Sequence, residues 1–109
     1  MYQEFDPERP EPSRAAIDAL RRPTVLEFGA SWCPICQGAQ PLIAGALAEQ
    51  PEVGHIKVED GRGKPLGRSF KVKLWPTLVF LRDGKEVARL VRPTSIAQIR
   101  EALGALWAA

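Results

Sequence analysis

The sequence contains few side chains that bind metal ions. Among its 109 residues there are two cysteines and a single histidine, His55. A structural zinc ion takes four such ligands, so a zinc or iron–sulfur site would need ligands from a second copy of the chain. We therefore expect no metal and no bound cofactor, and we interpret His55 as a surface or strand-end residue.

The sequence also lacks a long apolar run and a strong net charge. No apolar stretch approaches the roughly 18 residues that span a bilayer, and the formal net charge is only +2. Residues 1–14 are acidic and rich in proline, unlike the basic and apolar start of a leader peptide. These absences predict a cytoplasmic protein whose partners include neither a membrane nor nucleic acid.

Length and composition indicate one compact domain. A chain of 109 residues with 45% hydrophobic residues has the material for one ordinary core. We expect residues 1–12, with three prolines among charged residues, to form an extended or partly ordered arm that includes a short edge strand at residues 2–5. Residues 13–109 would form the domain, which we expect to be a monomer.

Apolar periodicity, caps and turn residues predict alternating helices and strands. The expected helices cover residues 14–21, 34–50, 65–70 and the segment from residue 95 onward, and the expected strands cover residues 25–29, 55–59, 77–81 and 86–91. In the second helix an apolar stripe of helical spacing would begin at Ile35. Asp83-Gly84 is a hairpin signal, and Ser95 with Gln98 is a capping box. This order predicts a mixed β-sheet with helices on both faces.

The two cysteines, Cys33 and Cys36, stand one helical turn apart where a predicted strand leads into a predicted helix. Unpaired N–H groups and the helix dipole at such a position stabilise a thiolate, and they lower a cysteine pKa from about 8.5 to between roughly 3.5 and 7.5. A thiolate is the form that attacks disulfides. In a reducing compartment such a pair is more often catalytic or metal-binding than a structural disulfide.

Several motifs follow one another in a fixed order: Trp32-Cys33-Pro34-Ile35-Cys36, then Pro41 inside the following helix, then Trp75-Pro76-Thr77, and finally Asp83-Gly84. In these motifs the sequence from about residue 23 to residue 107 resembles the thioredoxin family. The resemblance implies an α/β protein with the thioredoxin fold, in which a central mixed sheet of four to five strands is flanked by helices on both faces. It also implies a kink at Pro41 and a cis peptide bond before Pro76.

The resemblance implies catalytic roles for four residues. Cys33 would attack a disulfide of a partner, and the more buried Cys36 would then attack Cys33 and release the reduced partner, which leaves a Cys33–Cys36 redox disulfide. Glu27 matches a buried acid behind the cysteines, and Lys57 matches the lysine beside that acid. Because burial disfavours a charged carboxylate, such an acid can accept the proton of the second cysteine. The alternative is a carboxylate with access to water, or one merely paired with Lys57.

The resemblance further implies a client-binding groove around the first cysteine. Its expected members are Trp32, Pro34, Ile35, Trp75, Pro76, Arg92 and Pro93. A cis Pro76 would place the backbone of Trp75 beside Cys33, where an incoming chain pairs with it as an additional strand. The basic stretch of residues 62–73, which leads into Trp75, is either a solvated face or a surface that attracts acidic partners.

Some residues depart from the family pattern. Pro34-Ile35 stands where Gly-Pro is common, Gly29 stands where tryptophan is usual, and Trp75 stands where isoleucine is usual. Arg92-Pro93 replaces a small loop that contains glycine. A proline after the first cysteine also occurs in glutaredoxins, but their glycine pair is absent, so glutathione is the minority hypothesis for the substrate. These changes predict a reshaped groove and a narrower range of clients.

We therefore predict a thiol–disulfide oxidoreductase that reduces or exchanges protein disulfides without a bound cofactor. Its electrons would come from an upstream donor such as a thioredoxin reductase or another thiol protein. The alternative is a binding or adaptor module on the same fold, in which Cys33 and Cys36 are redox-inert or hold a metal.

Overall fold

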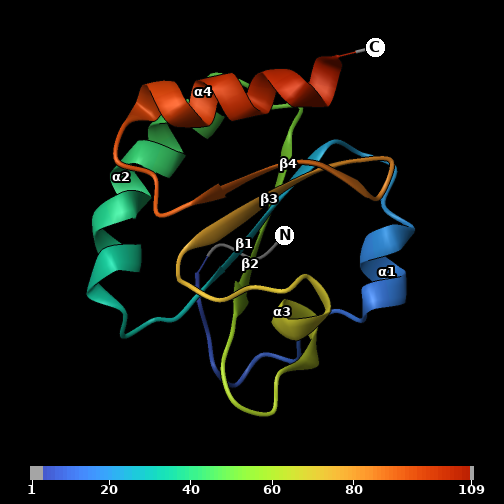
Figure 1. The fold of residues 1–109 in the computed structure, drawn as a ribbon, viewed down its shortest axis with the longest axis vertical. Coiled ribbons are helices and arrows are strands. Elements are labelled where there is room, and N and C mark those ends of the chain that lie inside the picture. Colours follow the sequence, from blue (N-terminus) through green and yellow to red (C-terminus); the bar gives the residue numbers. More distant parts are fainter. Residues whose placement is uncertain (1–3, 109) are drawn as a thin grey trace.

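The computed structural model describes residues 4–108. In chain order its elements are α1 (Arg14–Asp18), β1 (Thr24–Gly29), α2 (Pro34–Ala48), β2 (Gly54–Glu59), α3 (Pro65–Ser69), β3 (Thr77–Arg82), β4 (Lys85–Val91), α4 (Ile96–Gly104) and the short 3-10 helix η1 (Ala105–Trp107). Figure 1 shows the strands in the middle of the molecule with the helices around them. Within residues 4–108, no helix combines the length and the apolar character needed to cross a membrane.

The described strands form one mixed sheet of four strands in the order β2-β1-β3-β4. Strands β1 and β2 run parallel, whereas β1 with β3 and β3 with β4 are antiparallel. Helices α2 and α4 pack on one face of the sheet, and α1 and α3 pack on the other face (Figure 1). The predicted mixed sheet with helices on both faces is therefore confirmed.

Strand β1 is buried along its whole length and sends alternate side chains to opposite faces of the sheet. Leu26 and Phe28 join the core beneath α1 and α3, while Val25 joins the core beneath α2 and α4. Glu27 stands on the same face as Val25, because side chains in a strand alternate with a period of two. The fold thus places a carboxyl group beneath α2, the helix at whose start the cysteines lie.

Two local signals in the sequence are confirmed. Asp83 and Gly84 form the turn between β3 and β4, and both have positive φ, 51° and 76° respectively. Ser95 caps α4 and forms a capping box with Gln98. Both signals depend on residues that are close in sequence, so the chain needs no distant partner to realise them.

The buried stripe of α2 begins one residue later than predicted. Cys36, Ala39, Ile43 and Ala46 are buried at spacings of three and four residues, whereas Ile35 is 46% exposed. The first member of the predicted apolar stripe, Ile35, therefore stays outside the buried part of the helix. Its side chain lies at the surface beside the cysteines, where the family resemblance expects a groove residue.

The N-terminal elements also differ from the sequence prediction. Helix α1 ends at Asp18 rather than at residue 21. The edge strand predicted at residues 2–5 lies partly outside the described residues, and residues 4–5 are not in a strand. The arm instead runs along the domain, where Glu11 Oε1 accepts the backbone N–H of Leu66 at 2.9 Å.

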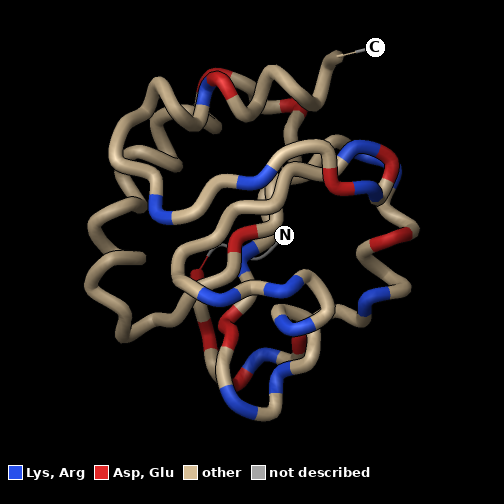
Figure 2. The backbone as a smooth tube through the Cα atoms, viewed as in Figure 1, with Lys and Arg blue, Asp and Glu red and all other residues tan. Residues whose placement is uncertain are grey.

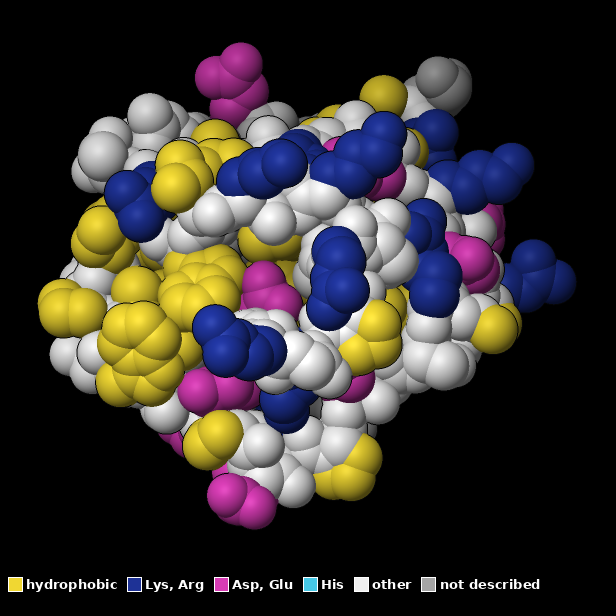
Figure 3. Space-filling model, turned by 60° about the horizontal axis from the view of Figure 1, so that its bottom comes forward, with side chains coloured by type: hydrophobic (Ala, Val, Ile, Leu, Met, Phe, Trp, Pro, Cys, Tyr) yellow, Lys and Arg dark blue, Asp and Glu magenta, His cyan; other side chains and the backbone are white. Residues whose placement is uncertain are grey.

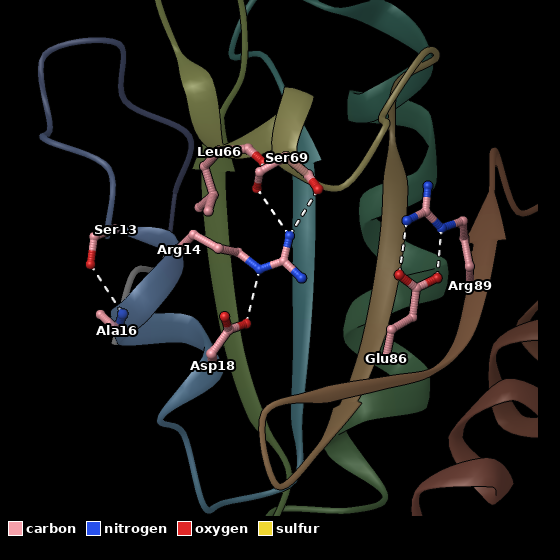
Figure 4. A network of polar contacts seen from close by, with 8 residues as sticks. All are labelled: Ser13, Arg14, Ala16, Asp18, Leu66, Ser69, Glu86 and Arg89. Atoms are coloured by element: carbon pink, nitrogen blue, oxygen red, sulfur yellow. Dashed lines mark hydrogen bonds and ion pairs between the residues drawn. The ribbon is translucent and has the colours of Figure 1, made fainter.

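Arginines from α1 and β4 hold the end of α3 in place. Arg14 Nη1 donates to the carbonyl oxygen of Ser69 at 2.8 Å, and the Arg14 guanidinium lies 3.8 Å from the ring centroid of Phe70. From the other side, Arg89 Nη2 donates to the carbonyl oxygen of Phe70 at 2.6 Å. Figure 4 shows Arg14 reaching from α1 to Ser69. These contacts fix the start of the loop of residues 71–76, which ends at the cysteine site.

Candidate active site

The cysteines lie at the junction of β1 and α2. Cys33 is the N-cap residue of α2, with an extended backbone, and Pro34 occupies the first helical turn. The Sγ atom of Cys33 accepts the backbone N–H of Cys36 at 3.2 Å. Amide N–H groups without a helical partner and the positive end of the helix dipole both meet at this position. The fold therefore places the sulfur of Cys33 where negative charge is stabilised.

Both cysteines are free thiols and both are largely covered. Cys33 is 6% exposed and Cys36 is 1% exposed, so Cys33 is the more accessible of the two by a narrow margin. The side chains of Trp75 and Phe5 pack against this pair. A client sulfur can therefore reach Cys33 through a small opening only, whereas Cys36 is closed to a direct attack.

Burial dominates the acidity of Cys36. It raises the pKa of the Cys36 thiol to about 12, with a further contribution from the hydrogen bond to Cys33 and smaller ones from the charges of Cys33 and Glu27. A thiol with this pKa is protonated throughout the neutral range. Cys36 therefore needs a base that removes its proton before it can act as a nucleophile.

The peptide bond between Trp75 and Pro76 is cis, as the sequence predicted. The rings of Trp75 and Trp32 meet edge to face with centroids 5.6 Å apart, and Trp75 Nε1 donates to Asp60 Oδ2 at 2.9 Å. Trp32 itself is 68% exposed. The two tryptophans thus form an apolar rim beside the cysteines, with one ring held by a hydrogen bond and the other open to solvent.

Arg92 and Pro93 have different places in the structure. Arg92 is exposed, and its Nε donates to the carbonyl oxygen of Trp75 at 2.9 Å. Pro93 is buried, so its side chain does not form part of the exposed groove surface that the sequence predicted for it. The Arg92 side chain thus occupies the carbonyl oxygen of Trp75, a backbone group that an added strand would need.

Glu27 is fully buried beneath α2, and both of its carboxylate oxygens have partners. Oε1 lies 2.7 Å from Nε2 of His55, and Oε2 accepts the side-chain amide of Gln40 at 2.8 Å. The same amide donates to the carbonyl oxygen of Cys36 at 2.9 Å. A hydrogen-bonded connection therefore runs from the buried carboxylate to the backbone of the second cysteine.

Lys57 does not form the expected ion pair with Glu27. The two residues face each other in the β1–β2 register, but within residues 4–108 the ion-pair partner of Glu27 is His55. The Lys57 ammonium lies 5.5 Å from the ring centroid of Phe5, a cation–π distance. Sequence reasoning predicted a surface or strand-end residue at His55, which does lie near the start of β2 with a 22% exposed side chain, but it missed this contact. The alternation of side chains along a strand could have indicated it, because residues 55 and 57 lie on the same face of β2 and either can therefore face Glu27.

Phe5 takes the space that a side chain at position 29 would need. A Cβ atom on Gly29 would lie 2.7 Å from Cζ of Phe5 and 2.9 Å from Sγ of Cys36, both too close for real atoms. The absence of a side chain at Gly29 therefore lets an aromatic ring from the N-terminal arm pack behind the second cysteine. The sequence carried no local signal for this contact, since 24 positions separate the two residues.

Comparison with known proteins agrees with this geometry. The family model described as Thioredoxin matches residues 10–105. The chain belongs to the thioredoxin family. The structure of thioredoxin 2 from Pseudomonas aeruginosa PAO1 in its reduced form superimposes with a TM-score of 0.83 at 56% identity, over 97% of this chain and 96% of that one. The structure of Fasciola hepatica thioredoxin gives a TM-score of 0.66 at 32% identity, over 76% and 79% of the two chains.

Curated relatives match over a shorter range. Thioredoxin H-type 1 from Nicotiana tabacum is 39% identical over 67 residues, which is 62% of this chain and 53% of the plant protein. Thioredoxin H-type from Fagopyrum esculentum is 34% identical over 67 residues, 62% of this chain and 58% of that protein. The chain thus spans somewhat more than half the length of these relatives. The family and the fold predicted from the sequence are confirmed.

The pKa of Cys36 predicts how stability depends on pH. Unfolded, this thiol has the ordinary pKa of 9.0, whereas folding raises it to about 12. Above pH 9 the unfolded state loses a proton that the folded state keeps, so the stabilising contribution of Cys36 is complete below that pH and declines as pH rises toward 12. The test is to measure the free energy of unfolding by urea for the reduced wild-type protein and for Cys36→Ala, from neutral to alkaline pH. The stability advantage of the wild-type protein over Cys36→Ala should shrink above pH 9, and an advantage that stays constant would contradict the burial of the thiol.

The contact of Phe5 with Gly29 predicts coupled mutations. Phe5→Ala should cost about 1–2 kcal/mol because the ring is half-buried, and Gly29→Ala should cost about 1–3 kcal/mol because the new methyl group overpacks the site. In the double variant the methyl group no longer meets the ring, so the loss should be smaller than the sum by about 0.5–1 kcal/mol. Urea unfolding of the four proteins measures the coupling. Strict additivity would mean that Phe5 does not pack against position 29.

Proposed function

We propose that this chain is a thiol–disulfide oxidoreductase that reduces or exchanges disulfides of other proteins through Cys33 and Cys36. The observation that carries the proposal is the placement of Cys33 as the N-cap of α2, with its sulfur accepting the N–H of Cys36. Membership of the thioredoxin family supports the same chemistry. The cis peptide bond before Pro76 lies in the segment that flanks the pair.

The reaction proceeds in two exchanges. The thiolate of Cys33 attacks one sulfur of the client disulfide, the client S–S bond breaks, and the other client sulfur leaves as a thiolate. Cys36 then loses its proton to a base, and its thiolate attacks the sulfur of Cys33. The bond between Cys33 and the client breaks, and the second client thiol is released. Two electrons have moved from the cysteine pair to the client, and the protein is left with an intrachain disulfide.

An upstream dithiol must return the protein to its reduced form. Such a donor, a thioredoxin reductase or another thiol protein, would attack the Cys33–Cys36 disulfide in the reverse sense and leave oxidised. The protein's own chemistry in this cycle uses sulfur atoms and one base, so no bound cofactor enters it. We propose that it works as a monomer in the cytoplasm, where the glutathione and thioredoxin systems keep thiols reduced.

The surface beside the cysteines favours clients with acidic residues near their disulfide. Exposed apolar side chains, Trp32, Ile35, Leu74 and Val91, supply contact area. Next to Trp75 lies a surface cleft of about 350 Å³, lined by the basic residues Arg62, Lys64, Arg68 and Lys73 and by one acid, Asp60. Figure 2 shows Lys and Arg following one another around α3, and Figure 3 shows apolar side chains gathered at one end of this basic face. Positive charge here attracts acidic segments toward the opening at Cys33.

The adaptor alternative is not favoured. Among residues 4–108 no group of three or more His, Cys, Asp or Glu side chains lies close enough together to hold a metal ion. The position of one thiol at the helix N-terminus and of the other buried a turn later supports an attacking and a resolving role for the two cysteines.

The proposed activity is tested with insulin as a model disulfide substrate and dithiothreitol as the donor. The wild-type protein should accelerate insulin reduction. Cys33→Ser should abolish the acceleration, because the attacking thiolate is gone. Pre-reduced Cys36→Ser, freed of dithiothreitol and then incubated with insulin, should accumulate a mixed disulfide that is visible on a non-reducing gel. Full activity of both serine variants would contradict the mechanism.

The proposed client preference is tested by reversing one charge. At low ionic strength, Lys73→Glu should lower kcat/KM for a disulfide peptide with acidic flanks by about 5-fold and leave a neutral peptide nearly unchanged. Lys85→Glu, at the start of β4, is the matched control for a change of the same net charge and should preserve the preference. If Lys73→Glu and Lys85→Glu lowered kcat/KM for the acidic peptide equally, the cleft would not take part in client recognition.

A further inference from the structure

The buried carboxylate of Glu27 depends on a partner that reaches water. Glu27 is 0% exposed, and an unpaired carboxylate at such a position would be strongly unfavourable. The Nε2 atom of His55 lies 2.7 Å from Oε1, and the side chain of His55 is 22% exposed. One member of this pair is therefore fully enclosed, while the other member connects it to the surface.

The exposed part of His55 faces a surface pocket. That pocket has a volume of about 350 Å³ and is lined by Glu4, Gln40, Ala44, His55 and Lys57. A second cavity of about 110 Å³, lined in part by Cys36, shares Gln40 and Lys57 with it. The pair thus lies between the buried thiol and the solvent. Among side chains, histidine is the one that exchanges protons most readily near neutral pH.

Gln40 connects the pair to the resolving cysteine. Its amide nitrogen donates both to Glu27 Oε2, at 2.8 Å, and to the carbonyl oxygen of Cys36, at 2.9 Å. This fixes the carboxylate beneath the first turn of α2. The negative charge of Glu27 also helps to raise the pKa of Cys36, which places the two groups within electrostatic range of each other.

We propose that His55 is a positioning residue that, with Glu27, forms a two-residue proton acceptor for Cys36 in the resolving step. The inference rests on the proposed function, and it assigns to His55 the role beside the buried acid that the family resemblance implied for Lys57. His55 orients the Glu27 carboxylate, shares the proton that Cys36 releases, and returns it to water at its exposed edge.

The proton and electron balance of this step is simple. Cys36 gives one proton to the pair, which then holds it either as imidazolium with carboxylate or as imidazole with carboxylic acid. The Cys36 thiolate attacks the sulfur of Cys33, the bond between Cys33 and the client breaks, and the client sulfur leaves with the electron pair and takes a proton from water. The pair afterwards loses its own proton to solvent, which restores the starting state.

The other charged and titratable groups around the pair lie on three elements. Lys57 is on β2 and has its ammonium near the ring of Phe5, Glu4 belongs to the N-terminal arm, and Cys33 lies with Cys36 at the start of α2. On β3 the residue opposite Glu27 is Leu78, which is apolar. Lys57 and Glu4 have opposite charges, and the imidazole of His55 is the titratable group in direct contact with the carboxylate.

Ellman's reagent, a small coloured-product disulfide, can serve as the client, because its two thiols are released one after the other. Attack by Cys33 releases the first nitrothiobenzoate, and resolution by Cys36 releases the second. His55→Gln keeps a hydrogen-bond donor for Glu27 but cannot take up a proton. In stopped-flow measurements from acidic to alkaline pH, His55→Gln should slow the second release about 10-fold near neutral pH. The rate of the second release should also depend less on pH in this variant than in the wild-type protein. The first release should change by less than about 2-fold, since the base does not act in that step.

Lys57→Gln is the matched variant, two positions along the same face of β2, and should affect the second release less than His55→Gln does. A wild-type rate and pH profile for His55→Gln, or a larger effect of Lys57→Gln, would overturn the inference. Failure of the wild-type protein to release the second nitrothiobenzoate would instead refute the proposed function.

A measurement on the folded wild-type chain covers the case in which His55→Gln does not fold. His55 is the single histidine of the sequence, so its ring signals in an NMR spectrum need no assignment. At one fixed pH these signals should differ between the wild-type protein and Glu27→Gln, because the carboxylate that lies 2.7 Å from Nε2 is gone. Unchanged ring signals would show that the carboxylate and the imidazole are not in contact.

Discussion

The site depends on one hydrogen bond at the start of α2, in which the backbone N–H of Cys36 donates to the sulfur of Cys33 at 3.2 Å. This contact makes a side chain of the reacting pair the cap of the helix, so the charge that the chemistry needs is also the charge that the helix end stabilises. The same turn places Cys36 on the buried side of the helix, where its proton is held firmly. The proposed roles of an attacking and a resolving cysteine thus follow from the positions of the two thiols in one helical turn.

The residues behind the first turn of α2 pack differently from what the sequence predicted. Gly29 leaves a space that Phe5 fills from the N-terminal arm, and Glu27 is paired with His55 and Gln40 rather than with Lys57. In both cases a residue on the strand next to the cysteines has its environment completed by a residue distant in sequence. The arm and β2 therefore contribute directly to the surroundings of Cys36, and the cysteine motif alone does not define them.

Much of the fold was predictable because its signals are local. The cysteine spacing, the Asp83-Gly84 turn and the capping box at Ser95 each depend on neighbours in the sequence, and the cis bond before Pro76 followed from the family resemblance. The errors concern distant contacts or small rotations. The apolar stripe of α2 was drawn from Ile35 although the helix is buried only from Cys36 onward, and the prediction of His55 as a surface or strand-end residue missed its contact with Glu27 on another strand. Such contacts depend on how strands and helices pack, which hydrophobic periodicity does not specify.

The central claim is that Cys33 and Cys36 form one reversible dithiol–disulfide couple within a single chain. The most direct test equilibrates the purified protein in glutathione buffers of graded redox potential and then counts free thiols and measures the mass of the folded chain. The account predicts that both thiols disappear together in one two-electron transition, that the product is a monomer with an intrachain disulfide, and that dithiothreitol reverses the change. Two thiols that persist under oxidising conditions, or oxidation that only joins separate chains, would contradict it.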